Sequence, residues 1–529
     1  MIKLRIDDKE VQVPENTSVM NAASIIGIEI PAMCFMEGYS NSPSCMVCLV
    51  KDKNSSKLFP SCAMPVIEGM EVVTDDDEVR EARKEALELL LSDHVGDCEA
   101  PCRNGCPAFM DIPRMNRLIA AGEFRKALET VKEEIALPLI LGYICEAPCE
   151  KVCRREPMDG AVSICRLKRF VADEDLKSTA TYFPQKGVDS GMTVAIVGAG
   201  PAGLAAAFHL VRQGHGVVVY DKHQKAGGSL LGVPDSILPA QALTAEIEYL
   251  EKYGVKFILD RAVDKLYFED KIRPAFDAIL LATGAPDAQS DTSFGALMDE
   301  KTYKIDRDTW ETGVPGIFIC GSAVKKQHMA IRAVAQGKAA ARSVMAFLDG
   351  RQPAKERKMF NSRFGKLMPE EHEEYLKESV TGERTVPANG ELAGFLAEEA
   401  VREAERCMHC DCRKPATCKL RLYADEYGAD RKKYLSDERR PVRKQFTHKS
   451  IVYEQEKCIK CGLCVEIAAK DKELTGLTFI GRGFDVHVGV PFTRELGEAL
   501  TRTARECALA CPTAAISLKE KLTDENNES

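Results

Sequence analysis

The sequence lacks the features that would place the protein in a membrane or on nucleic acid. Its longest apolar run, IALPLILGYI, has ten residues and is broken by Pro138, whereas a membrane-spanning helix needs about 20 apolar residues. Lys and Arg are scattered along a chain of net charge −9, so no surface for nucleic acid or an anionic membrane is expected. The stretch MIKLRIDDKEVQV has no apolar signal core. We therefore expect a soluble, cytoplasmic protein.

Disulfide bonds are also not expected, although the chain of 529 residues contains 21 cysteines. Without a secretion signal, so many cysteines indicate metal ligands. Nearly all fall into four groups, at 34–62, 98–165, 407–418 and 458–511, with Cys320 alone. Short spacings within the groups are typical of iron–sulfur clusters, which take thiolates from successive turns of one loop. A chain of this length should divide into about three to five domains.

The first 80 residues predict a [2Fe–2S] domain. IKLRIDD and KEVQV predict two strands, and NTSVMNAASIIGI a helix capped at Asn16 or Thr17. Three thiolates on one loop and a distant fourth are typical of a [2Fe–2S] cluster, with zinc as the alternative. The pattern C-x10-C-x2-C-x13-C resembles the amino-terminal domain of the large iron–sulfur subunit of respiratory complex I and of related hydrogenases and formate dehydrogenases, which implies a β-grasp ferredoxin. The candidate ligands are Cys34, Cys45, Cys48 and Cys62.

Residues 81–185 predict a helical module with two [4Fe–4S] clusters. A charged helix, EVREARKEALELLLSDH, precedes HVGDCEAPCRNGCPAFMDIP, and ICEAPCEKVCRRE and GAVSICRLKRF follow. These motifs resemble the amino-terminal module of the glutamate synthase small subunit and of dihydropyrimidine dehydrogenase, in which each cluster draws ligands from both loops. The resemblance implies one set of Cys98, Cys102 and Cys153 and another of Cys106, Cys145 and Cys149.

Each of these two sets needs a fourth ligand. The family's first loop begins with a cysteine that this chain lacks, but His94 stands four residues before Cys98. An H-x3-C opening holds a cubane through imidazole in the large iron–sulfur subunit of complex I, and the alternative is an exposed histidine favoured by the helix dipole. For the second set the family uses a side chain of the following helix, close to the position of Cys165, whose alternative is a buried structural thiol. His94 and Cys165 are the expected fourth ligands.

Residues 190–350 predict a Rossmann-like FAD domain. MTVAIVGAGPAGLAAAFHLVRQGHGVVVYD predicts a strand, a GxGxxG turn, a helix and a second strand. Gly198 forms the turn, Gly200 lets the backbone approach the pyrophosphate, and Gly203 lets the helix pack on the strand. GAGPAGLAAA, KAGGSL and LLATGA resemble the FAD-binding domain of the glutamate synthase small subunit. The residues implied are Gly198, Gly200, Pro201, Ala202, Gly203, Asp221, Gly228, Thr283, Gly284, Gly321 and Ser322.

The nicotinamide domain of that family is missing from the sequence. In the family, LATGA leads into a second Rossmann domain before the chain returns to the flavin. Here 27 residues separate Ala285 from Gly313, whereas such a domain needs roughly 100 residues or more. No second GxGxxG occurs, and the return segment GVPGIFICGSA has Gly321-Ser322 where the family has Gly-Asp. We therefore expect FAD but no direct binding of NAD(P)H.

The last 180 residues predict two more [4Fe–4S] clusters. CMHCDCRKPATC follows a helix, with zinc as the alternative metal, and its candidate ligands are Cys407, Cys410, Cys412 and Cys418. KCIKCGLCVEIAAKD and CALACPTAAI resemble a bacterial two-cluster ferredoxin that has lost one cluster, because Ala468 replaces the fourth cysteine of the first run. The other cluster is expected on Cys458, Cys461, Cys464 and Cys511, with Cys507 spare.

Together the motifs predict a multidomain α/β and α+β protein with FAD, one [2Fe–2S] and four [4Fe–4S] clusters. The expected domains are 1–80, 81–185, 190–350, 351–440 and 441–529. Because clusters pass single electrons and flavin exchanges two, we expect an electron-transferring subunit of an anaerobic hydrogenase, formate dehydrogenase or NAD(P)/ferredoxin complex, with electron bifurcation as an option. Its partners would be other redox subunits, with ferredoxin among the candidates. The alternatives are a self-contained flavin reductase for a small substrate or ferredoxin, and a non-redox scaffold.

Overall fold

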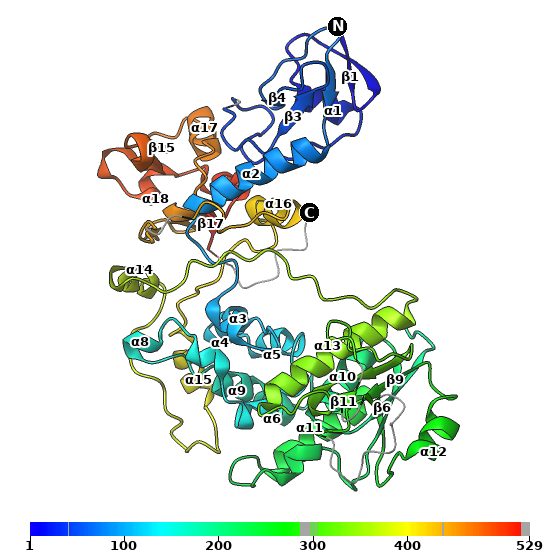
Figure 1. The fold of residues 1–529 in the computed structure, drawn as a ribbon. Helices are drawn as coiled ribbons and strands as arrows, with labels where there is room; N and C mark the ends of the chain where they lie inside the picture. The colour runs from blue at the N-terminus through cyan, green and yellow to red at the C-terminus, as the bar shows by residue number, and fades with distance from the viewer. Residues whose placement is uncertain (41, 286–297, 300–301, 304, 436–438, 520–529) are drawn as a thin grey trace. The chain divides into compact units, whose positions relative to one another are not determined.

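The computed structural model describes the whole chain except residues 41, 286–297, 300–301, 304, 436–438 and 520–529. The chain divides into two compact units. The first unit comprises Met1–Ala100, Lys358–Glu378 and His409–Ser529, and the second comprises Pro101–Arg357 and Ser379–Met408. Helices and sheets occur in both, as the multidomain α/β class requires (Figure 1). Within the described ranges, no helix is long and apolar enough to cross a membrane.

The first unit begins with a five-stranded mixed sheet covered by one helix. Its strands, in the order β2-β1-β5-β3-β4, are β1 (Ile2–Ile6), β2 (Lys9–Val13), β3 (Leu49–Asp52), β4 (Leu58–Pro60) and β5 (Glu71–Val73). Burial alternates along β1 and β2, so that one face of the hairpin enters the core beneath α1 (Val19–Ile25). Strand β5 pairs parallel with β1 and antiparallel with β3. Strand β5 therefore joins the β1–β2 hairpin to the β3–β4 hairpin in one sheet.

Helix α1 begins later than the sequence predicts. Its N-cap is Ser18, whose Oγ accepts a hydrogen bond from the N–H of Asn21 at 3.2 Å. The hydroxyl of Thr17 instead donates to the carbonyl of Pro14 at 2.8 Å, and Asn16 has a φ of 66°. The prediction of Asn16 or Thr17 as the cap is therefore wrong, because both residues belong to the turn that precedes the helix.

The rest of the first unit joins a long helix to a small C-terminal α+β domain. Helix α2 (Asp77–Asp93) begins at the N-cap Asp76 and ends at the C-cap His94. The helices that follow in this unit are α14 (His372–Leu376), α16 (Lys419–Glu426), α17 (Leu463–Lys470), α18 (Leu496–Ala499) and α19 (Ala504–Ala510). The strands are β13 (Lys444–Gln445), β14 (Ile451–Glu454) and β17 (Ile516–Leu518) in one sheet, and β15 (Thr478–Ile480) and β16 (His487–Gly489) in a hairpin. Met36 and Tyr39 of the N-terminal domain pack against the core of this C-terminal domain.

The second unit begins with a helical module. Its helices are α3 (Pro101–Gly105), α4 (Ile112–Ala120), α5 (Phe124–Lys132), α6 (Pro138–Ile144), α7 (Pro148–Lys151), α8 (Glu156–Asp159), α9 (Ile164–Lys177) and, from later in the chain, α15 (Ala397–Ala404). Helices α6 and α9 approach closely at Gly142, where an added Cβ would lie 2.3 Å from the Cβ of Arg169. This contact fixes two helices whose ends carry candidate ligands.

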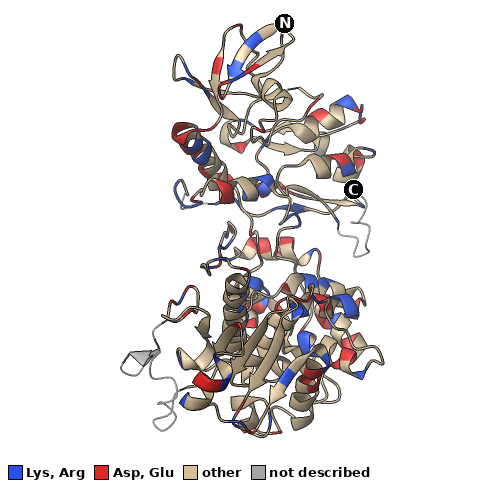
Figure 2. Ribbon diagram, turned by 90° about the vertical axis from the view of Figure 1, so that its right-hand side faces the viewer, with Lys and Arg blue, Asp and Glu red and all other residues tan. Residues whose placement is uncertain are grey.

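A five-stranded parallel sheet forms the rest of the second unit. Its strands, in the order β12-β9-β6-β7-β8, are β6 (Thr193–Val197), β7 (Gly216–Tyr220), β8 (Val255–Ile258), β9 (Ala278–Leu281) and β12 (Ile317–Ile319). The associated helices are α10 (Pro201–Arg212), α11 (Ala240–Tyr253), α12 (Lys265–Tyr267) and α13 (Ala330–Leu348), and β10 (Met298–Asp299) and β11 (Thr302–Tyr303) form a separate hairpin. Figure 2 shows acidic and basic residues interspersed along the helices of both units. The Rossmann-like sheet expected from the sequence is present.

Candidate metal and dinucleotide sites

The C-terminal domain contains a small pocket, of about 20 Å³, beside α17. The loop that enters α17 turns through left-handed backbone at Lys460 and Gly462, with φ of 58° and 78°. This turn presents thiols from three positions on one side of the loop, and a fourth comes from the end of α19. The cysteines that line the pocket are Cys458, Cys461, Cys464 and Cys511. They are the four candidate ligands that the sequence indicated for this domain.

Backbone N–H groups and a spare thiol surround this pocket. The N–H of Lys460 donates to the Sγ of Cys458 at 3.3 Å, and the N–H of Ile516 donates to the Sγ of Cys511 at 3.4 Å. Such N–H donors to sulfur stabilise thiolates and set the potential of a bound cluster. Cys507 is buried but does not line the pocket, and its thiol donates to the carbonyl of Cys464 at 3.7 Å. Its position fits the expectation of a spare cysteine.

The four N-terminal candidate ligands form one buried group of thiols. The Sγ atoms of Cys34 and Cys45 are 3.4 Å apart. Hydrogen bonds with Cys45 and then Cys62 lower the pKa of Cys34, and a hydrogen bond with Cys62 lowers the pKa of Cys48 to about 7. All four side chains are at most 4% exposed. The donor set is therefore the one that a buried two-iron cluster requires.

The charges of four cysteines of the helical module act on one buried lysine. Lys168, on α9, is 3% exposed and lies with its Nζ 4.0 Å from the Sγ of Cys165. Burial alone would lower the pKa of Lys168, but the charges of the surrounding thiols outweigh burial and raise the pKa. Hydrogen bonds link the Cys165 thiol to two of the others. The four thiols are those of Cys106, Cys145, Cys149 and Cys165. The structure thus brings together the set that the resemblance implies, and Cys165 lies within it.

Cys102 and Cys153 lie on two short helices of the same module. Cys102 is on α3, and Cys153 follows α7, where its N–H donates to the carbonyl of Glu150 at 3.1 Å. The two helices touch at Gly105, where a Cβ would lie 2.5 Å from a side-chain methyl of Val152. Both cysteines belong to the second unit, whereas Cys98 belongs to the first.

His94 ends α2 with a buried, unpartnered ring nitrogen. Its Nδ1 is buried without a hydrogen-bond partner, and the ring bonds to the backbone of Lys457. That bond therefore uses Nε2, which leaves the Nδ1 lone pair available. Burial, followed by the positive charges of Lys457 and Arg431, lowers the pKa of His94 to about 4. A neutral imidazole whose second nitrogen is hydrogen-bonded to backbone is the usual state of a histidine that binds metal.

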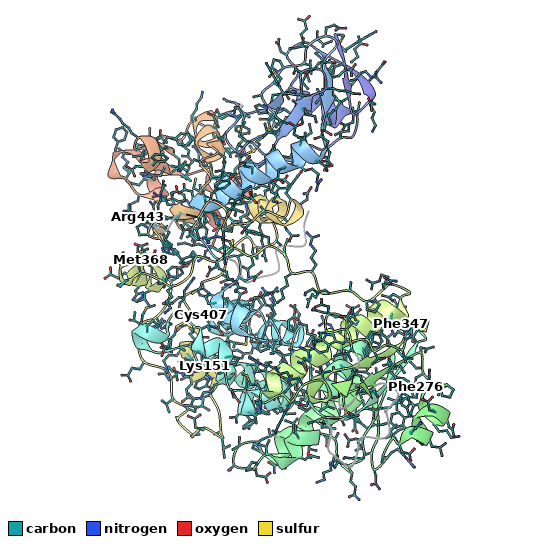
Figure 3. All side chains as sticks on the ribbon, in the orientation of Figure 1. Lys151, Phe276, Phe347, Met368, Cys407 and Arg443 are labelled. Atoms are coloured by element: carbon teal, nitrogen blue, oxygen red, sulfur yellow. The ribbon has the colours of Figure 1, made fainter. Side chains whose placement is uncertain are left out.

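The CMHCDCRKPATC segment is divided between the two units. Cys407, labelled in Figure 3, follows α15 in the second unit, whereas the other three cysteines of the segment belong to the first. In the first unit the N–H of Cys412 donates to the carbonyl of Cys98 at 3.3 Å. Cys418 is the N-cap of α16, and burial raises its pKa to about 12. Cys410 is half-buried, and its charge acts on the buried ammonium of Lys444.

The glycine-rich turn of the parallel sheet fits a dinucleotide pyrophosphate. A Cβ at Gly198 would lie 2.3 Å from the carbonyl oxygen of Ala282, and a Cβ at Gly203 would lie 2.0 Å from that of Gly198. Gly200, at the N-cap of α10, has no atom within 4 Å of such a Cβ. Two of these glycines are therefore needed for the fold, and Gly200 borders open space at a helix N-terminus, where a phosphate binds.

The other candidate FAD residues lie at the carboxyl ends of neighbouring strands, where ligands of such sheets bind. Asp221 follows β7, and its carboxylate accepts from the N–H of Ala199 at 2.7 Å and meets the Nδ1 of His223 at 2.7 Å. Gly228 packs against Gly200, because its Cβ would lie 2.8 Å from the Gly200 Cα. The remaining positions are Pro201 and Ala202 on α10, Thr283 and Gly284 after β9, and Gly321 and Ser322 after β12.

Some of the expected features lie outside the described residues or were not foreseen. Residues 286–297 of the short connection after β9 are not described. Cys320 is fully buried, and burial raises its pKa to about 12, as expected for a core residue.

Sequence reasoning did not indicate Lys168, since a lysine three residues after a cysteine usually lies on the solvated face of a helix. In the described part of the chain, no three or more His, Cys, Asp or Glu side chains are arranged to hold a single metal ion.

Comparison with known protein families identifies three of these regions. Residues 1–77 match a 2Fe-2S iron-sulfur cluster binding domain. Residues 73–180 match domain II of dihydropyrimidine dehydrogenase, a 4Fe-4S cluster domain. Residues 196–249 match an NAD(P)-binding Rossmann-like domain. The chain therefore contains two iron–sulfur domains and a Rossmann-like dinucleotide-binding domain.

Similar individual proteins are redox proteins of several kinds. The chain is 37% identical over 207 residues to the NADP(+)-dependent formate dehydrogenase subunit beta of Moorella thermoacetica, which covers 35% of this chain and 29% of that protein. It is 34% identical over 208 residues to the NADPH-Fe(3+) oxidoreductase subunit beta of Geobacter sulfurreducens, covering 39% and 30%. It is 35% identical over 185 residues to the glutamate synthase [NADPH] small chain of Bacillus subtilis, covering 34% and 37%.

A solved structure of an NAD+-reducing [NiFe]-hydrogenase is similar at 26% identity and a TM-score of 0.17, over 23% of this chain and 49% of that one. The chain spans well under half the length of the three curated relatives named above. The chain thus contains iron–sulfur and Rossmann-like regions and is related in sequence to chains of formate dehydrogenase, NADPH–iron oxidoreductase and glutamate synthase.

Proposed function

We propose that the protein is an electron-transferring oxidoreductase subunit that carries FAD, one [2Fe–2S] cluster and four [4Fe–4S] clusters. Its cluster ligands would be His94 and every cysteine except Cys320 and Cys507. Iron–sulfur clusters supply single-electron steps and flavin supplies two-electron exchange. The observation that carries the proposal is the small pocket lined by the four cysteines of the C-terminal motif.

The N-terminal domain is held against the C-terminal domain by its cysteine loop. The hydroxyl of Tyr39 donates to Glu506 at 2.7 Å, and the hydroxyl of Ser40 donates to Glu466 at 2.8 Å. Lys470 stacks over the Tyr39 ring, with its Nζ 4.1 Å from the centroid. These contacts hold the loop that begins at Cys34 against α17 and α19 of the C-terminal domain. A fixed distance between two redox sites is what an electron relay needs.

Hydrogen bonds also join the segments that carry Cys418 and Cys511. The N–H of Lys419, the residue after Cys418, donates to the carbonyl of Pro512, the residue after Cys511, at 2.8 Å. The ammonium of Lys414 donates to the carbonyl of Cys511 at 2.8 Å. One hydrophobic cluster contains Cys34 and Cys45 of the N-terminal site together with Cys418. Cys461 of the C-terminal site packs against the same cluster. The first unit therefore supports a relay of neighbouring sites.

The Rossmann-like domain would bind FAD and leave nicotinamide chemistry to a partner subunit. Gly200 at the N-terminus of α10 would face the pyrophosphate, and Asp221 would face the ribose. The short connection between Ala285 and Gly313 leaves no room in the sequence for a separate nicotinamide domain. We therefore propose a cytoplasmic complex with other redox subunits, of the formate dehydrogenase, hydrogenase or NAD(P)/ferredoxin type.

This proposal is tested by purifying the tagged chain anaerobically from its native cells. We expect at least one further redox subunit to co-purify, and turnover of formate, hydrogen, NAD(P)H or reduced ferredoxin to require that subunit. A Cys511→Ala chain should assemble into the same complex but pass fewer electrons to a dye acceptor, and a Cys507→Ala chain serves as the control. If the purified chain alone reduced or oxidised one of these substrates as fast as the complex, it would be a self-contained reductase instead.

A further inference from the structure

Cys98 is tied to the loop that carries Cys412 and Cys418. The N–H of Cys412 donates to the carbonyl of Cys98 at 3.3 Å. Cys98 in turn pairs with Ser362 in both directions, because its N–H donates to the Ser362 carbonyl at 3.1 Å and its Sγ accepts from the Ser362 N–H at 3.4 Å. All four residues belong to the first unit. The thiol of Cys98 is therefore fixed at the loop of Cys412, whatever the position of the second unit.

An internal ion pair holds the same two segments together. Arg421, in the first turn of α16, donates to the carboxylate of Glu99 at 2.7 Å. Both side chains are 7% exposed. The same guanidinium donates to the carbonyls of Pro415 and Phe360 at 3.1 Å and 2.9 Å. One buried arginine thus anchors the residue after Cys98 to the loop between Cys412 and Cys418. A buried pair of this kind is costly to break, so it specifies the arrangement.

The thiols of Cys98, Cys412 and Cys418 are all buried. Their side chains are at most 8% exposed, and no disulfide joins them. Three buried thiols on segments that these bonds hold together supply three of the four ligands that a cubane needs.

His94 supplies a fourth ligand at this place. Its Nδ1 is buried and unpartnered, while its ring is oriented by the backbone of Lys457. A Cβ added at Gly96, two residues before Cys98, would lie 3.3 Å from the Nε2 of His94 and 2.9 Å from the Cε of Lys457. The imidazole therefore lies against the segment that carries Cys98. A buried acceptor without a partner is unfavourable, and a bound iron atom would give it one.

We propose that His94, Cys98, Cys412 and Cys418 together bind one [4Fe–4S] cluster within the first unit. This regroups ligands that the sequence assigns to two different clusters: the family resemblance places Cys98 with Cys102 and Cys153, and the spacing of the later motif places Cys412 and Cys418 with Cys407 and Cys410. The inference rests on the proposed function, because it presupposes [4Fe–4S] clusters. It goes further by naming the four side chains that bind one of these clusters. The cluster has one neutral ligand, so it carries one more positive charge than an all-cysteine cubane.

The regrouping is tested by single substitutions and redox-titrated EPR of the whole chain, reconstituted anaerobically with ferrous iron and sulfide. We expect Cys98→Ala and Cys418→Ala to abolish the same [4Fe–4S] signal. The matched control is Cys102→Ala, which should abolish a different signal and leave the first intact. His94→Cys should retain the cluster and lower the midpoint potential of that same signal, because a thiolate replaces a neutral imidazole.

The outcomes separate the grouping from the proposed function. If Cys98→Ala and Cys102→Ala removed the same signal, or if Cys98→Ala and Cys418→Ala removed different ones, the regrouping would be wrong. A His94→Cys chain whose only potential shift occurred in a signal unaffected by Cys418→Ala would also contradict it. If the unsubstituted chain bound no [4Fe–4S] clusters at all, the proposed function itself would fail. Size-exclusion chromatography and iron content of each variant show whether the fold and the other clusters are retained.

Discussion

The buried lysine of the helical module should set the potential of the cluster beside it. We expect Lys168→Met to lower the midpoint potential of one [4Fe–4S] centre. The ammonium lies 4.0 Å from the Sγ of Cys165 and is acted on by the charges of four thiols, and the side chain is 3% exposed. Adding an electron to a cluster there is favoured by the positive charge. Methionine keeps the length and apolar part of the side chain and removes only that charge.

The size of the shift follows from Coulomb's law. With the added electron about 6 Å from the ammonium and an effective dielectric constant of about 20, the interaction is about 2.8 kcal/mol. A tenfold change in an equilibrium constant corresponds to about 1.4 kcal/mol or 59 mV for one electron. The midpoint potential should therefore fall by about 120 mV. Relaxation of nearby water and dipoles would reduce this value to roughly half.

The assay is an EPR-monitored redox titration of the anaerobic chain with and without the substitution. The matched control is Lys177→Met, because this residue lies on the same helix but its side chain is 70% exposed. That variant should leave every midpoint within the error of the titration. The reasoning would be refuted if Lys168→Met moved no cluster by more than about 20 mV, or if the potential rose.

Three further substitutions test separate parts of the account, each with a matched partner. Cys511→Ala should remove one cluster, and so about four iron atoms per chain, whereas Cys507→Ala should leave the iron content unchanged; iron analysis would contradict the assignment if both lost iron. Gly200→Ala should weaken dinucleotide binding roughly tenfold or more, because the new methyl group occupies the space of the pyrophosphate. Gly313→Ala, also open within 4 Å, should not; equal flavin retention in the two would oppose the site. Lys419→Pro should slow electron transfer between the two adjoining clusters, because proline is tolerated at the first helical position but removes the N–H that joins their segments. Lys419→Ala keeps that N–H, so equal rates in the two variants by pulse radiolysis would exclude this route.

The parallel sheet and the ligand motifs could be predicted from the sequence because both depend on local patterns. The GxGxxG turn at Gly198 requires glycine for steric reasons that act between neighbouring residues, since a Cβ there would meet the carbonyl oxygen of Ala282. The CxxCxxC loop likewise carries its geometry in its own spacing, and the pocket beside α17 is lined by the cysteines that this spacing selects. Short-range sterics and short-range ligand spacing are visible in one sequence.

Long-range neighbours could not be predicted in the same way. Cys412 bonds to Cys98 across more than 300 positions of the chain, and no periodicity connects the two. The buried setting of Lys168 depends on helices α6 and α9 meeting at Gly142, which is a tertiary contact. The N-cap at Ser18 was missed because three adjacent polar residues were all suitable caps, and the turn at Pro14 decided between them.

The central claim is that electrons enter and leave this flavin and these clusters without a nicotinamide site on the chain. Stopped-flow spectroscopy of the anaerobically purified, partner-free chain tests it directly. Mixing with NADH or NADPH should leave the oxidised flavin and cluster absorbance unchanged over the turnover time of the complex, while a low-potential one-electron donor such as dithionite should reduce both. Rapid, stoichiometric bleaching of the flavin by either nicotinamide nucleotide would contradict the account.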